Sequence, residues 1–173
     1  MKKLFVAFIA ILLVGTIQET KAQFSVGAGL GYASDISTIG ISANVGYEID
    51  ETWQATGSYT HFLEKDDIKW SAIDFNANYN LNKIENFGEL YAIGGINITT
   101  IKWDYPEFSD YGIDIPGMDY SSDGSDSDSN FGVNIGAGVK IDLSEKMFLA
   151  PEMTYTISDG SYLRIGAKLM FKI

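Results

Sequence analysis

The sequence contains no cysteine, one histidine and three prolines among its 173 residues. The lack of cysteine excludes a disulfide scaffold, a cysteine-ligated zinc site and a thiol nucleophile. The single histidine, His61, rules out most multi-histidine metal sites and leaves little material for a catalytic triad. Basic residues are scarce too, with 12 Lys and Arg against 23 Asp and Glu and a net charge of −11. We therefore expect no cofactor, no metal, no catalytic site and no nucleic-acid partner.

The first 22 residues have the pattern of a cleavable signal peptide. Two lysines precede an apolar run at 4–14, and residues 20–22 form a small-x-small cleavage site. The run is too short for a membrane-spanning helix, which needs about 20 apolar residues. We predict a signal peptide at 1–22 and one domain at 23–173, with a membrane anchor as the alternative.

Beyond the signal segment, apolar side chains alternate with small or polar ones, and helical periodicity is missing. An alternation of period two is typical of β-strands that have two different faces. Eight segments show it: 24–32, 39–49, 53–61, 73–81, 89–98, 131–141, 147–157 and 162–173.

One face of every segment carries bulky apolar side chains and no charge, whereas the other is mostly Gly, Ser, Thr and Asn. The interior of an eight-stranded barrel is only just wide enough for side chains, so the small face must point inward. A bulky outer belt would aggregate in water but suits lipid. We predict an all-β fold: an eight-stranded antiparallel up-and-down transmembrane β-barrel.

Outward aromatic residues gather near the strand ends, at the level of the lipid headgroups. They are Phe24, Tyr47, Trp53, Tyr79 and Phe171 at one end, and Tyr32, Tyr59, Phe131 and Tyr155 at the other.

The connections predict an orientation in the membrane. Those at 50–51, 82–86 and 144–145 are short, whereas the connection at 101–129 is long. Membrane barrels have short periplasmic turns and longer extracellular loops. We therefore place the connection at 101–129 outside the cell.

The last segment carries a polar residue, a glycine, an apolar residue and an aromatic residue in the order Arg164-x-Gly166-x-x-Leu169-x-Phe171. With this motif and its eight alternating segments, the chain resembles the small outer-membrane β-barrels of the OmpA/OmpX-like type from Gram-negative bacteria. The resemblance implies that the motif is the signal read by the barrel assembly machinery. It also implies an integral, porin-like outer-membrane protein, exported through the periplasm and surrounded by outer-membrane lipid and lipopolysaccharide. We expect a monomer.

Charged residues on the inward face form the first candidate site. Unpaired charges in a narrow lumen are costly, and paired charges form hydrogen-bonded networks. We expect a network of salt bridges that stabilises the barrel; the alternative is a narrow or gated pore for small solutes, although eight strands leave no aqueous channel. The residues are Glu48, Asp74, Glu89, Lys140, Glu152, Arg164 and Lys168.

The connection at 101–129 is the second candidate site. It contains eight acidic residues and a single basic one, Lys102. Long connections without secondary structure of their own tend to be functional or disordered. We expect its aromatic half to contact an extracellular protein or surface ligand. The candidate contact residues are Trp103, Tyr105, Phe108, Tyr111 and Tyr120.

The same connection offers a weak calcium pattern. Asp126, Asp128 and Asn130 repeat oxygen ligands at alternate positions. However, Phe131 occupies the place of the glycine at position six of an EF-hand loop, and no Glu stands at position twelve. We therefore expect a solvated or protein-binding loop here.

His61 is the third candidate. Pairing Trp53 with Tyr79 puts His61 opposite Ser71 on the outward face. Some small outer-membrane barrels modify lipid A with a lipid-facing Ser and His, so a lipid A-modifying enzyme is the second alternative function. The preceding strand offers Ser37 and Ile39 at that height, and neither supplies the orienting acid of a triad.

These patterns together predict an outer-membrane barrel with a structural or surface-interaction role, acting through its extracellular loops.

Overall fold

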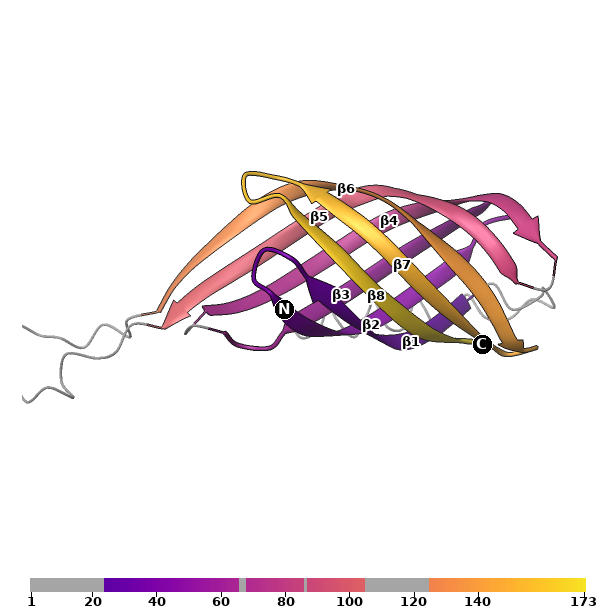
Figure 1. Cartoon of the computed structure of the whole chain (residues 1–173), viewed down its shortest axis with the longest axis horizontal. Helices are drawn as coiled ribbons and strands as arrows, with labels where there is room; N and C mark the ends of the chain where they lie inside the picture. Colours follow the sequence, from indigo (N-terminus) through magenta and orange to yellow (C-terminus); the bar gives the residue numbers. More distant parts are fainter. Residues whose placement is uncertain (1–23, 66–67, 86, 105–124) are drawn as a thin grey trace, which may run out of the picture.

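The described part of the chain forms one closed barrel of eight antiparallel strands (Figure 1). This computed structural model describes residues 24–65, 68–85, 87–104 and 125–173. No helix in these ranges is long and apolar enough to cross a bilayer. The strands are β1 (Phe24–Ala33), β2 (Thr38–Glu48), β3 (Trp53–Phe62), β4 (Ile68–Ile84), β5 (Gly88–Asp104), β6 (Ser125–Ser144), β7 (Met147–Ile157) and β8 (Tyr162–Lys172).

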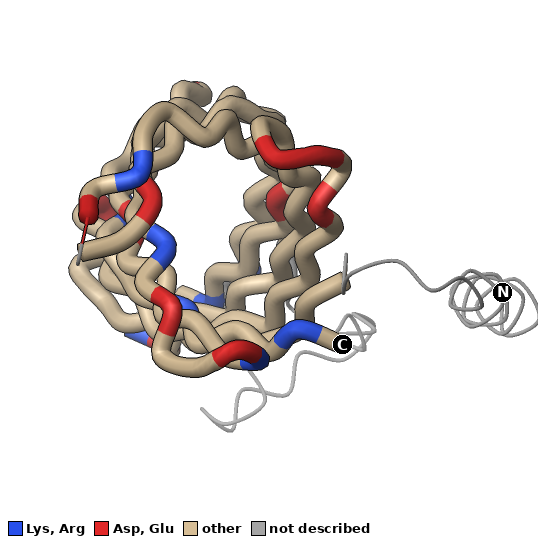
Figure 2. Tube along the Cα trace, turned by 90° about the vertical axis from the view of Figure 1, so that its right-hand side faces the viewer, with Lys and Arg blue, Asp and Glu red and all other residues tan. Residues whose placement is uncertain are grey.

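Each strand pairs with its neighbour in sequence, and β8 returns to pair with β1. Leu30 of β1, for example, lies between Ile41 of β2 and Ala167 of β8. The end-on view in Figure 2 shows the resulting ring. Closure leaves no free strand edge, so backbone groups within lipid are satisfied without water. The predicted eight-stranded antiparallel barrel is confirmed, whereas the signal peptide predicted at 1–22 lies outside the described residues.

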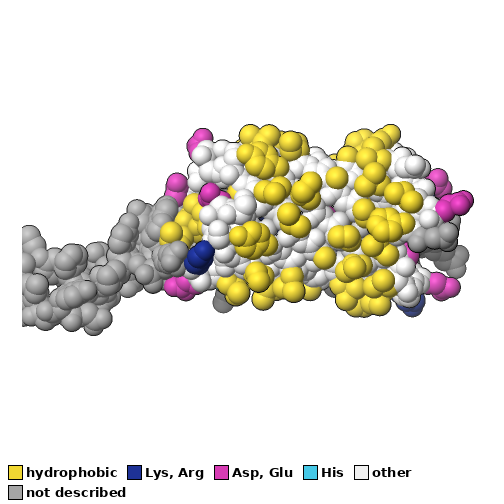
Figure 3. Space-filling view, in the orientation of Figure 1, with side chains coloured by type: hydrophobic (Ala, Val, Ile, Leu, Met, Phe, Trp, Pro, Cys, Tyr) yellow, Lys and Arg dark blue, Asp and Glu magenta, His cyan; other side chains and the backbone are white. Residues whose placement is uncertain are grey.

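The two faces of the strands also match the prediction. Leu30 and Phe131 on the outer face are 61% and 63% exposed, whereas Asp74 and Asn78 on the inner face are buried. Near one end of the barrel, the rings of Trp53 and Tyr79 pack with centroids 4.9 Å apart. In Figure 3, hydrophobic side chains cover the visible flank of the barrel, and charged side chains gather toward its two ends. The outer surface is therefore suited to lipid along its middle and to water at its ends.

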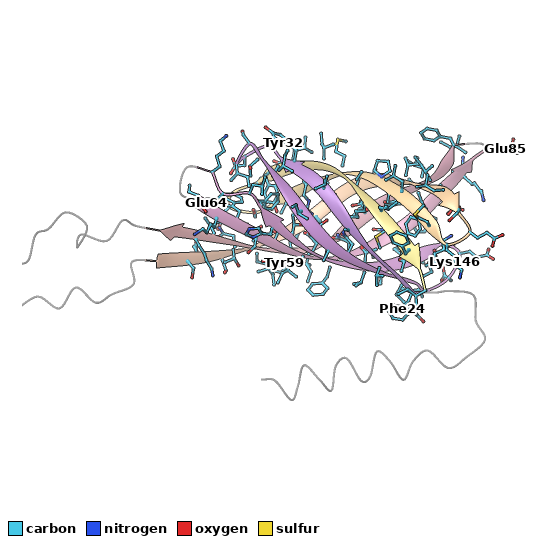
Figure 4. All side chains as sticks on the ribbon, turned by 90° about the horizontal axis from the view of Figure 1, so that it is seen from below. Phe24, Tyr32, Tyr59, Glu64, Glu85 and Lys146 are labelled. Atoms are coloured by element: carbon cyan, nitrogen blue, oxygen red, sulfur yellow. The ribbon has the colours of Figure 1, made fainter. Side chains whose placement is uncertain are left out.

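The two ends differ in their connections. The end with the short connections β2–β3, β4–β5 and β6–β7 is called the turn end, and the opposite end, where β5 and β6 project, is called the loop end. Figure 4 places Phe24, Glu85 and Lys146 at the turn end and Glu64 toward the loop end.

The predicted limits of two connections are wrong. β4 continues to Ile84, which pairs with Gly88 beyond a register shift at Asn80/Asn82, so 82–84 belong to a strand. The connection predicted at 101–129 is shorter at both ends, because β5 runs to Asp104 and β6 begins at Ser125. The sequence pattern of alternating apolar side chains ends where contact with lipid ends. Backbone pairing between the strands continues beyond that apolar band, so the strands are longer than the pattern predicts.

Candidate functional site

Asp74 joins β4 to four other strands across the middle of the lumen. Its carboxylate is fully buried and lies 2.8 Å from the guanidinium of Arg164 on β8. Asn97 Nδ2 and Asn134 Nδ2 donate hydrogen bonds to Oδ1, at 2.7 and 2.8 Å, from β5 and β6. Ser58 Oγ of β3 donates to Oδ2 at 2.9 Å. A buried charge with one ionic partner and three donors avoids the cost of an uncompensated one.

Two further ion pairs lie closer to the turn end. Lys168 Nζ of β8 lies 2.6 Å from Glu152 on β7, and the hydroxyl of Tyr91 on β5 donates to the same carboxylate at 2.9 Å. Lys140 Nζ of β6 reaches Glu48 of β2 at 2.6 Å. The structure thus arranges six of the seven charged residues named from the sequence as three pairs that each link two strands.

Glu89 is the seventh, and the structure does not pair it with a lumen lysine. Its register partner is Lys140, but the ammonium of Lys140 lies against Glu48. Glu89 instead lies 3.7 Å from Lys83 Nζ, whose side chain is 73% exposed at the turn end. Such an exposed contact contributes little to stability.

The position of Tyr91 depends on a glycine. Tyr91 lies opposite Gly138 in the β5–β6 ladder, and a Cβ at Gly138 would overlap the tyrosine ring. The missing side chain lets the ring lie along the barrel wall and direct its hydroxyl to Glu152. The alternation places both residues inward, but it does not indicate that they touch.

An aromatic cluster lies in the loop-end half of the lumen. Phe62, Trp70 and Tyr162 are buried together with Ala33 and Ala72. The Trp70 and Tyr162 rings meet edge to face, with centroids 6.1 Å apart. This cluster was missed from the sequence, although Phe62 and Trp70 continue the inward alternation of their strands.

A hydroxyl connects the cluster to the Asp74 network. Tyr162 Oη lies 3.2 Å from Thr99 Oγ1 and 3.4 Å from Asn97 Nδ2, and this amide also donates to Asp74. Beside Arg164, a cavity of about 30 Å³ remains, with room for about one water molecule. Within the described lumen, the aromatic cluster therefore lies between the Asp74 network and the loop end.

The residues of the predicted assembly signal all lie on β8. Arg164 points inward to Asp74, and a Cβ at Gly166 would meet the backbone of Leu30 on β1. Leu169 and Phe171 face outward, with 36% and 46% of their surfaces exposed. Reading of this motif by the assembly machinery stays a prediction.

Most of the predicted contact loop lies outside the described residues, including Tyr105, Phe108, Tyr111 and Tyr120. Trp103 lies at the end of β5, where its backbone pairs with Ile68 and Asp126. The role of these aromatic residues in binding stays a prediction.

The calcium pattern lies in a strand. Asp126, Asp128 and Asn130 belong to β6, where alternate residues are about 6.6 Å apart. Calcium ligands converge within about 2.3–2.6 Å of a single ion. Among the residues that the structure describes, no group of three acidic or histidine side chains is placed to hold a metal. The three residues therefore lie along one extended strand and not in a loop, as the pattern of a calcium-binding loop would require.

His61 pairs with Ser71 across β3 and β4, in the register derived from the sequence. The β2 neighbour of His61 is Ile41. The expectation of Ser37 and Ile39 at this height is therefore wrong, because Ile41 lies two residues beyond Ile39 on the same outward face. Neither register partner of His61 is acidic. The pair therefore has the geometry of a cross-strand contact without the third group of a triad.

Comparisons with known proteins agree with this architecture. A family model described as an outer membrane protein beta-barrel domain matches residues 4–171. The N-terminal β-barrel domain of Pseudomonas aeruginosa OprF is 17% identical, with a TM-score of 0.57 over 85% of this chain and 97% of that one. Neisserial surface protein A is 15% identical, with a TM-score of 0.56 over 87% and 96%. Ail of Yersinia pestis is 17% identical, with a TM-score of 0.51 over 86% and 96%. The comparison with curated proteins gave no match.

Proposed function

Because this chain belongs to the outer membrane protein β-barrel domain family, we propose that it serves as a stable membrane anchor whose loop end contacts a partner outside the cell. The barrel is integral to the outer membrane. The observation that carries the proposal is a contrast between the two parts of the molecule: side chains cross the lumen at its middle and toward the loop end, whereas the β5–β6 hairpin projects beyond the other strands at the loop end (Figure 1).

The filled lumen argues against transport. Asp74 and Arg164 cross its middle, and the cluster of Phe62, Trp70 and Tyr162 lies between them and the loop end. A solute would have to displace an ion pair whose fully buried Asp74 side chain links five strands. Planar-bilayer recordings of the purified barrel should therefore give flat traces. Reproducible conductance steps would favour the pore instead.

The chemistry of the partner follows from the charge of the hairpin and its connection. Residues 101–129 carry eight acidic side chains and one lysine. The Ail structure was solved in complex with the heparin analogue sucrose octasulfate, which is a polyanion. Like charges disfavour association, whereas complementary charges steer it. The partner proposed for this chain is therefore a positively charged protein surface, unlike the ligand of that Ail structure.

Deletion of residues 105–124 tests the proposal. Barrels reconstituted in vesicles of neutral phosphatidylcholine would be applied to surfaces coated with polylysine or with heparin. The intact protein should adhere to polylysine, weakly at high salt, and the deletion variant should not. A control variant, Asp35→Asn with Asp159→Asn, neutralises two loop-end carboxylates outside the hairpin, against the five that the deletion removes, and should keep adhesion. Equal adhesion of the deletion variant, or a preference for heparin, would refute the proposed contact.

A further inference from the structure

The turn-end half of the lumen contains a cavity of about 380 Å³, here called the turn-end cavity. Asp50 and Glu51 of the β2–β3 turn line it together with side chains deep in the lumen, so it extends from the rim inward. Figure 2 looks into this end of the barrel and shows acidic residues around the ring. Its volume lies at the lower end of the range for small-molecule sites, roughly 300–1,000 Å³.

The lining of the turn-end cavity is acidic. Lys140 and Lys168 line it, but each lies 2.6 Å from one carboxylate. Three further carboxylates have no lumen lysine as partner, so the lining has a net charge of −3 if all groups are ionised. The five carboxylates are Glu48, Asp50, Glu51, Glu89 and Glu152.

Two buried amide oxygens in the lining lack a donor. Asn44 and Asn78 are 4% and 3% exposed, and Oδ1 of each has no hydrogen-bond partner among the described residues. Their amide nitrogens are engaged: Asn44 Nδ2 donates to Ser42 Oγ at 2.9 Å, and Asn78 Nδ2 donates to Gln54 Oε1 at 3.2 Å. Asn44 Nδ2 also donates to the Ser42 carbonyl oxygen at 3.3 Å, and in this orientation of the two amides each oxygen remains an acceptor. A buried acceptor without a donor is unfavourable, so the cavity favours a guest with N–H groups.

One side of the turn-end cavity is apolar. Phe148, Ala150 and Met170 form a buried cluster of β7 and β8, and all three line the cavity. Lys140 Nζ already lies 5.0 Å from the centre of the Phe148 ring, within cation–π range. An alkyl chain fits against such a wall.

We propose that the turn-end cavity binds an aliphatic primary ammonium group, supplied either by a small diamine or by a lysine side chain of another protein. The net negative lining attracts the charge, the acceptors of Asn44 and Asn78 require N–H donors, and the apolar wall accommodates methylene groups. A metal ion fits poorly, since among the described residues no three acidic or histidine side chains converge. With the loop end outside the cell, this guest comes from the periplasm. The proposal does not depend on the contact proposed for the loop end.

Methyl NMR of ¹³C-methionine-labelled barrel tests the proposal. Met170 lines the cavity and is 4% exposed, whereas Met153 is 53% exposed on the outer face and serves as internal control. The probes are cadaverine and Nα-acetyl-lysine N-methylamide, with tetramethylammonium chloride at equal ionic strength as a cation without N–H donors. The expected result is a saturable shift of Met170 with a primary amine, no shift of Met153, and no effect of tetramethylammonium.

The two probes separate the sources of the group. A response to cadaverine alone identifies a free diamine, and a response to the lysine derivative identifies a protein side chain. Three results would overturn the proposal. The first is the lack of a saturable shift of the Met170 methyl signal with either amine. The others are a Met170 shift of equal size with tetramethylammonium chloride, and a Met170 shift when calcium chloride is the only addition.

Two variants localise the binding. Glu51→Gln with Glu89→Gln removes two carboxylates that no lumen lysine pairs, and it should weaken binding by about tenfold or more. Glu85→Gln with Glu145→Gln makes the same charge change at turn-end positions outside the lining and should leave binding unchanged. Equal weakening in both pairs would mean that bulk charge, not the cavity, holds the amine, and would overturn the proposal.

Filling the cavity provides a test that does not alter charge. Thr56→Phe places a ring in the lining and should abolish the Met170 response, with folding checked by heat-modifiable migration on a gel. Retained binding in a folded Thr56→Phe barrel would overturn the proposal. If this variant does not fold, the two charge pairs decide the question alone.

Discussion

Arg164 Nη2 lies 2.8 Å from Asp74 Oδ2, and the Asp74 side chain has no exposed surface. The two residues are 90 positions apart in sequence and belong to strands that are not neighbours in the barrel. Their contact therefore spans the lumen and links β4 directly to β8. Because the Arg164 side chain is only 14% exposed, loss of Asp74 would leave a nearly buried positive charge without its ionic partner.

Asp74→Ala should lower the free energy of unfolding by about 3–5 kcal/mol, the range for breaking one side of a buried ion pair. The measurement is urea unfolding in lipid vesicles, followed by tryptophan fluorescence. Asp142→Ala is the control: it breaks a pair with Lys172 in which the Asp142 side chain is 50% exposed, and it should cost about 0–1 kcal/mol. Equal losses for the two variants would contradict the structural role of the Asp74 network.

Gly138→Ala should destabilise the barrel by about 1–3 kcal/mol, as overpacking does, because its Cβ would overlap the Tyr91 ring. Gly94→Ala is the matched control, since a Cβ there meets nothing within 4 Å. The same urea unfolding compares the two. A Gly138→Ala barrel as stable as Gly94→Ala would show that Tyr91 does not need the space.

Met153→Lys should cost about 2–4 kcal/mol, because it places a charge on the lipid face near the middle of β7. Ile157→Lys makes a similar change at the end of the same strand and should cost about 0–1 kcal/mol. Folding into vesicles of defined thickness measures both values. A cost that does not depend on depth would contradict a lipid-facing belt.

Ser71→Ala and His61→Ala should leave lipid A acylation of the host unchanged, since no acidic residue pairs with His61 in the ladder. Mass spectrometry of extracted lipid A provides the measurement. A change in acyl-chain number in either variant would instead reveal a lipid-modifying activity.

The prediction from sequence was accurate where local patterning reports the surroundings of a side chain. Alternation of period two distinguishes a lipid face from a lumen face, so Leu30 was placed outside and Asp74 inside, and both are there. Hairpin geometry also gave the register of His61 and Ser71. Strand ends were predicted less well, because pairing at Lys102 or Ser127 continues where lipid no longer requires an apolar side chain.

The sequence by itself determined the barrel, the number of its strands and the inward set of charges, because each depends on a short-range period of two. Only the tertiary structure decided which charges meet. Lys140 binds Glu48 across the lumen although Glu89 is its ladder partner, and Tyr91 reaches Glu152 over Gly138. Such contacts join strands that are not neighbours in the ring, and the stagger of the closed barrel sets their relative heights. The turn-end cavity, with its two unpaired amide oxygens, likewise arises only once eight inward faces are brought together.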